Sequence, residues 1–136
     1  MDSLAIQLVL HGVLVLLVSI FGGWFLYRAI LKDTKESAWH LLHAGGSVRG
    51  VMLIALGATI HYPVLPMWQI STIAWLIIFF TWTSVLAMLL AAVSGERGLR
   101  CTGSIANKTV YILYGVGTIA IFPALFWLSF GLLRAL

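Results

Sequence analysis

The chain is short of charge and of cysteine. Only 9% of its 136 residues are charged and 62% are hydrophobic, whereas an ordinary soluble domain carries about 25% charged residues. The single cysteine, Cys101, excludes an intrachain disulfide, a Cys-X-X-Cys redox centre and a cysteine-rich zinc site. The four acidic residues all lie outside the long apolar runs. This composition excludes a soluble globular domain and predicts an integral membrane protein.

Four apolar segments, at about residues 4–30, 38–60, 67–93 and 109–133, are separated by charged and turn residues. Each is long enough to cross a bilayer, because a spanning helix needs roughly 20 apolar residues. A backbone in lipid must satisfy its own hydrogen bonds, which favours helices. The sequence therefore predicts an all-α fold, an integral-membrane four-helix bundle with one domain over residues 1–136.

The basic residues are concentrated around two of the three connectors. Six of the eight lie in or beside connectors 31–37 and 94–108: Arg28, Lys32, Lys35, Arg97, Arg100 and Lys108. The positive-inside rule then places these two connectors in the cytoplasm and both termini outside. Nucleic-acid binding needs a basic stripe on a folded face, which this pattern does not supply. We expect the lipid bilayer as a partner and no nucleic acid.

Ionisable residues within a membrane span are costly and are therefore functional candidates. Arg49 lies roughly 9 Å deeper than His43, at 1.5 Å per residue, and no carboxylate is available at its depth. Either carbonyl groups, Ser47 or another helix satisfy Arg49, or its counter-ion is a cofactor carboxylate or a polar substrate group. His11 reaches a depth similar to that of Arg49, so these two are candidate neighbours, whereas His11 and His43 lie at different depths.

His40 and His43 are spaced i, i+3 and lie on adjoining sides of one helix. Histidine is a common axial ligand of haem iron. The alternative is a hydrogen bond within the bundle, and this is favoured for His40, which lies nearer the membrane interface. Gly46 and Gly50 follow on the same helix, where small residues usually allow close helix packing. The alternative is that these glycines leave a flat face for a macrocycle beside its axial ligand. Too few ligands are present for a structural zinc site.

Residues 39–52, Trp-His-Leu-Leu-His-Ala-Gly-Gly-Ser-Val-Arg-Gly-Val-Met, resemble the second-helix motif of styrene oxide isomerase. In that motif, Trp is followed four residues later by His, then by Gly, and then by Asn-Gly-Met. Residues 11–14, His-Gly-Val-Leu, are similar to an early motif of the same family. The spacing from Trp82 to residues 97–99 is similar to the third helix of the family and the turn after it.

The resemblance implies a homotrimer in the bacterial inner membrane that binds haem b. It implies His43 as the axial iron ligand, with Gly46, Gly50, Arg49 and His11 around the cofactor. The ferric iron would act as a Lewis acid on an epoxide oxygen, with no net redox change. Ring opening followed by a 1,2-hydride shift would then give the aldehyde, in an apolar cavity that excludes water.

Two positions that the resemblance identifies as substrate contacts differ from the family pattern. Arg49 stands where the family has Asn, and Met88 stands where it has Tyr. The short first connector is similar to that of the hydroxylaminobenzene mutases, which convert an aryl hydroxylamine to an aminophenol. We therefore expect a haem-dependent isomerase acting on a small aromatic substrate, with Arg49 and Met88 in the catalytic site. The alternatives are a mutase of that kind, or a non-catalytic or electron-transfer haem protein.

Overall fold

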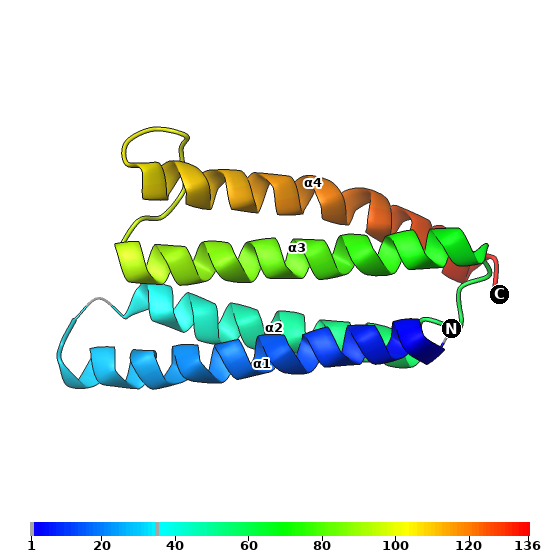
Figure 1. The fold of residues 1–136 in the computed structure, drawn as a ribbon, viewed down its shortest axis with the longest axis horizontal. Helices are drawn as coiled ribbons and strands as arrows, with labels where there is room; N and C mark the ends of the chain where they lie inside the picture. The colour runs from blue at the N-terminus through cyan, green and yellow to red at the C-terminus, as the bar shows by residue number, and fades with distance from the viewer. Residues whose placement is uncertain (1, 35) are drawn as a thin grey trace.

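A computed structural model describes residues 2–34 and 36–136. Four helices run back and forth along one direction (Figure 1), and they are α1 (Asp2–Leu31), α2 (Ser37–Thr59), α3 (Met67–Ser94) and α4 (Ile105–Leu133). The described residues contain no strand. All four helices are long and apolar enough to cross a membrane. The prediction of an all-α protein with four spanning helices is confirmed.

The predicted bounds of α1, α2 and α3 agree with the structure to within two residues, but α4 begins four residues before the expected position 109. The cause is a local cap. The Ser104 hydroxyl accepts a hydrogen bond from the backbone N–H of Asn107 at 3.1 Å, which satisfies one of the free donors at a helix start. The helix therefore begins within the polar connector, upstream of the point where the apolar run starts.

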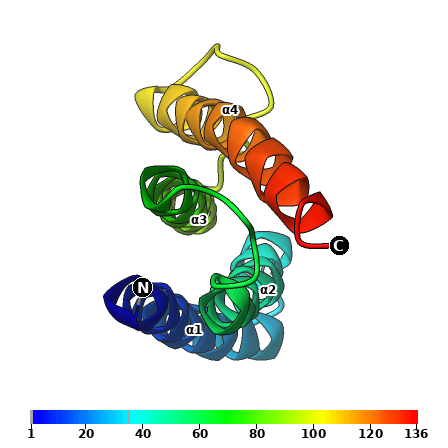
Figure 2. The same ribbon diagram turned by 90° about the vertical axis from the view of Figure 1, so that its right-hand side faces the viewer.

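The helices form two tight pairs, α1 with α2 and α3 with α4. The pairs meet mainly through α2 and α3, with a smaller contact between α1 and α3. The end view in Figure 2 shows α4 crossing on the far side of α3 from α1. Among the described residues, no Cα atom of α4 lies within 8 Å of one in α1 or α2. The backbones of α2 and α4 are consequently held apart.

Glycines allow the close packing of α1 on α2. A Cβ atom on Gly12 would lie 2.7 Å from the Gly50 carbonyl oxygen, and one on Gly50 would lie 2.7 Å from Leu16 Cγ. A Cβ atom on Gly46 would lie 3.2 Å from Ser19 Cβ. The faces of Gly46 and Gly50 are thus filled by α1, as expected of small residues at a helix–helix contact. Within one chain, α1 occupies this face, and cofactor binding by Gly46 and Gly50 stays a prediction.

We expect Gly50→Ala to destabilise the protein by about 2 kcal/mol, because the added methyl group must push the α1 and α2 backbones apart. The matched control is Gly115→Ala in α4, where a new Cβ atom would meet nothing within 4 Å. Thermal unfolding of the detergent-purified variants measures the difference. Equal melting temperatures for the two variants would contradict this account of the α1–α2 contact.

Candidate functional site

His43 lies on α2 at the contact with α1. Its Nδ1 atom is 2.9 Å from the backbone carbonyl oxygen of Ser19. A carbonyl oxygen can only accept, so Nδ1 carries the proton and Nε2 keeps its lone pair. The imidazole lies against Gly23, where a Cβ atom would approach Nδ1 to 2.7 Å. Metal-bound histidines usually donate their second ring N–H in this way, and His43 is therefore oriented as a potential axial ligand.

Two serines fix the backbone around His43. Ser19 is fully buried, and its Oγ atom lies 2.7 Å from Ser47 Oγ. Both hydroxyl groups contact the His43 carbonyl oxygen, and the bond that Ser47 donates measures 2.7 Å. Ser47 therefore belongs to the His43 surroundings and makes no hydrogen bond with Arg49. Ser19 was missed from the sequence, where its only signal is a hydroxyl residue within a long apolar run.

Arg49 points to the other side of α2, toward α3. Its guanidinium carbon lies 5.3 Å from the centroid of the Phe80 ring, and Nη1 donates to the Gly45 carbonyl oxygen at 3.1 Å. The Nε atom is buried and has no hydrogen-bond partner within residues 2–34 and 36–136. Carbonyl bonding thus satisfies only part of the guanidinium. Arg49 keeps donors available for a ligand.

Arg49 and Met88 line one groove of about 710 Å³ between α2, α3 and α4. A Cβ atom on Gly45 would lie 3.0 Å from Met88 Cε and 3.2 Å from Arg49 Nη1, so the glycine gives both side chains room. The structure therefore brings the two predicted substrate contacts together. The groove is completed by Leu41 of α2, by Arg97, Gly98 and Leu99 of the α3–α4 connection, and by Tyr111, Tyr114, Gly115, Thr118 and Ile119 of α4.

The α3–α4 connection is held in shape by Asn107. Its side chain accepts from the Gly98 N–H at 2.9 Å and donates to the carbonyl oxygens of Arg100 and Thr102 at 2.8 and 2.7 Å. Gly98 has a φ of 62°, which favours glycine. This loop closes one end of the groove, a role that the basic residues of the segment alone did not reveal.

His11 lies between α1 and α3, away from both other candidates. Its Nδ1 atom accepts a hydrogen bond from the Trp82 indole N–H at 3.0 Å, and the Trp75 and Trp82 rings stand edge-on, 6.2 Å from it between centroids. Arg49, by contrast, contacts Phe80. The expected pairing of His11 with Arg49 is therefore not formed within the chain.

The predicted site residues thus occupy different faces of α2. His43 contacts Ser19 and Gly23 of α1, whereas Arg49 faces α3 and the groove toward α4. In residues 2–34 and 36–136, no group of three or more His, Cys, Asp or Glu side chains could hold a metal ion. A haem differs from such an ion because one axial side chain is enough to hold its iron.

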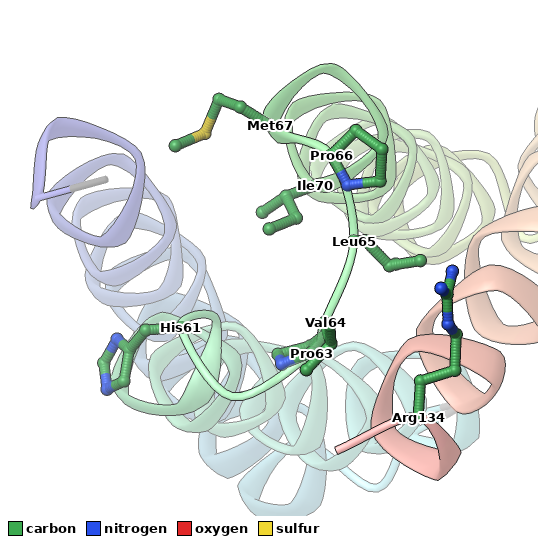
Figure 3. A pocket seen from close by; sticks show the side chains of 8 residues that line it. All are labelled: His61, Pro63, Val64, Leu65, Pro66, Met67, Ile70 and Arg134. Atoms are coloured by element: carbon green, nitrogen blue, oxygen red, sulfur yellow. The ribbon is translucent and has the colours of Figure 1, made fainter.

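A second cavity, of about 400 Å³, lies at the end of the molecule formed by the α2–α3 connection. Figure 3 shows apolar loop residues around it, with His61 and Arg134 on opposite sides and pointing apart. His61 is exposed, as predicted for a residue in this connector. Because none of the predicted site residues lines this cavity, it is not the candidate site.

Comparison with known proteins identifies the family of the chain. A family model described as styrene oxide isomerase matches residues 4–133. A search of curated proteins found no match. The match spans nearly the whole chain, including all four helices and every residue of the candidate site. The chain therefore belongs to the styrene oxide isomerase family.

Proposed function

We propose that the protein is a haem-b-dependent membrane isomerase that rearranges a small aromatic epoxide to an aldehyde without net redox change. Membership of the family supports an isomerase in general. The observation that carries the haem assignment is the His43 imidazole, whose Nδ1–H is held by the Ser19 carbonyl so that Nε2 is free to bind iron. Haem b, when bound, would supply a Lewis-acidic iron to the substrate oxygen.

Other residues of the chain would orient His43, donate hydrogen bonds to the ligand and exclude water. The Ser19 carbonyl holds the proton on His43 Nδ1 and so keeps Nε2 basic. Arg49 offers N–H donors to a substrate oxygen or to a cofactor carboxylate. Met88 and the apolar side chains beside it keep water out of the groove, which would prevent trapping of a ring-opened substrate as a diol.

A homotrimer would resolve the separation of His43 from Arg49. The two side chains point to different sides of α2 within one chain, so a single substrate cannot touch both in the same copy. A head-to-tail ring of copies can place the His43 face of one against the Arg49 groove of the next. From the basic residues, we place this assembly in the bacterial inner membrane, with connectors 31–37 and 94–108 cytoplasmic and both termini outside.

The second candidate function is that of a hydroxylaminobenzene mutase. Arg49 lines the groove and donates to the Gly45 carbonyl oxygen through Nη1, and such a cation suits a substrate more polar than an epoxide. An electron-transfer haem protein with two axial histidines receives less support, because His11 Nδ1 is engaged by Trp82 on another face. The proposed reaction class is therefore an intramolecular rearrangement in either case.

Product analysis tests the proposal. We expect the detergent-purified, haem-loaded protein to convert styrene oxide to phenylacetaldehyde with no added reductant or oxidant and with no diol. Phenylhydroxylamine is offered in a parallel assay, in which aminophenol as the sole product would select the mutase. The control is protein inactivated by heat, because both substrates rearrange slowly on their own. Turnover of neither substrate above that control would contradict an isomerase.

A further inference from the structure

Tyr114 of α4 lies in the groove beside Arg49, and neither the motifs nor the family resemblance pointed to it. Its ring packs against the cluster of Val85 and Met88 on α3. Tyr114 and Arg49 line the same groove. No hydrogen bond to the described residues engages its hydroxyl group. The apolar part of Tyr114 is thus held by α3, and its polar end is left to the groove.

Arg49, which lines the same groove as Tyr114, has N–H donors that are not used in hydrogen bonds to the described residues. A guanidinium carries five N–H donors, and Arg49 makes one hydrogen bond, from Nη1 to the Gly45 carbonyl oxygen. Its Nε atom is buried and has no partner among the described residues. Because Nε is buried, an acceptor atom in the groove would meet the Nη donors that the Gly45 carbonyl leaves unused. The groove is therefore suited to a ligand that carries an oxygen.

The shape and lining of the groove fit a compact aromatic molecule. Ligand pockets of about 300–1,000 Å³ are lined mostly by apolar side chains with a few polar groups, and this groove measures about 710 Å³. Met88 is only 2% exposed and contributes an apolar thioether. Among the polar residues of the lining, Arg97, Tyr111 and Thr118 are exposed, whereas Arg49 and Tyr114 are half-buried.

We propose that Tyr114 and Arg49 together bind the oxygen atom of the aromatic substrate, with the aromatic ring against Met88. This inference rests on the proposed function and adds a substrate-binding residue to it. Gly115 leaves open space beside Tyr114, since a Cβ atom there would meet nothing within 4 Å, and Ile119 on the same flank is 74% exposed. This flank of the groove is thus open within a single copy of the chain.

Two matched probes test the role of Tyr114: 2-phenylethanol, which carries the oxygen, and ethylbenzene, which lacks it. Saturation-transfer NMR on the detergent-purified full chain measures binding of each. We expect the wild type to prefer 2-phenylethanol to ethylbenzene, and Tyr114→Phe to reduce that preference about fivefold, the value of one net hydrogen bond, while Arg49 keeps the remainder. In turnover assays, the same variant raises KM more than it lowers kcat. Tyr27→Phe, an equal change at an exposed tyrosine of α1, keeps the wild-type preference.

A His43→Ala variant separates this inference from the proposed reaction. His43 lies on the other side of α2, so the variant should keep the probe preference while it loses haem. A wild type that prefers 2-phenylethanol but isomerises no substrate would overturn the proposed reaction and leave the groove assignment in place. An unchanged preference in Tyr114→Phe overturns the assignment, as does a wild type that binds neither probe. Loss of haem in Arg49→Gln also overturns it, because Arg49 would then bind a cofactor carboxylate.

Discussion

His43→Ala is expected to give a folded protein that retains about a tenth or less of the wild-type haem, because the variant lacks the only proposed axial ligand. Isomerisation of the substrate should fall with the haem. The structure supports a local effect, because the imidazole makes one hydrogen bond, to the Ser19 carbonyl oxygen. The helices α1 and α2 remain in contact through Gly12 and Gly50. Haem per chain, measured by absorption after purification, gives the result directly.

His40→Ala is the matched control for this change. His40 lies one turn earlier on the same helix and is exposed, so its removal should leave haem content and turnover unchanged. Imidazole added to the His43→Ala protein is expected to restore part of the haem absorption, since a free ligand can occupy the vacated position. A His43→Ala variant that keeps both haem and activity would falsify the assignment of the axial ligand.

Gly23→Ala should weaken haem binding without removing any ligand. The new methyl carbon would lie 2.7 Å from His43 Nδ1 and 2.9 Å from Cε1, which is too close, so the imidazole must turn away. Its hydrogen bond to the Ser19 carbonyl oxygen is then lost. Disturbing the outer partner of a metal ligand typically lowers metal affinity about 10- to 100-fold. Haem titration of the apoprotein measures the affinity.

Gly22→Ala separates this effect from general crowding of the helix pair. A Cβ atom on Gly22 would lie 2.9 Å from Leu42 Cγ but 3.5 Å from the nearest atom of His43, its backbone N. Both variants crowd the α1–α2 contact, and only Gly23→Ala displaces the imidazole. We expect similar losses of stability for the two but weaker haem binding for Gly23→Ala alone. Equal haem affinities would show that the Gly23 contact does not orient His43.

The helices were predictable because hydropathy alone identifies a membrane span. For three of the four helices, the first and last residues followed directly from the apolar runs. The start of α4 did not, because a side-chain cap at Ser104 begins the helix inside a polar segment. Capping by one hydroxyl group is a local feature that a hydropathy profile cannot resolve.

The sequence identified only those residues of the site that belong to a family motif. The family motif pointed to Arg49 and Met88 as substrate contacts, and both line one groove. Tyr114 was missed because α4 carries no motif, and its position beside Arg49 depends on how α4 crosses α3. Depth along the helices suggested that His11 lies near Arg49, but depth does not fix the rotation of a helix. The hydrogen bond from Trp82 holds His11 against α3 instead.

The rotation of α2 about its own axis also determines which neighbour its glycines face, and depth along the helix does not reveal that rotation. Gly46 and Gly50 share a face with small-residue spacing, which fits both helix packing and a cofactor surface. The close approach of Leu16 and Ser19 from α1 shows that packing uses this face. Only the helix partner distinguishes the two roles, and the partner is a property of the tertiary structure.

The most direct test of the central claim is an absorption spectrum of the detergent-purified wild-type protein, with haem quantified per chain. His43 as an axial ligand with an open position opposite predicts a Soret band, close to one haem per chain, and a shift of that band on addition of styrene oxide or phenylhydroxylamine. A protein that is colourless even after expression with added haem would contradict the role of His43 and the haem-dependent reaction.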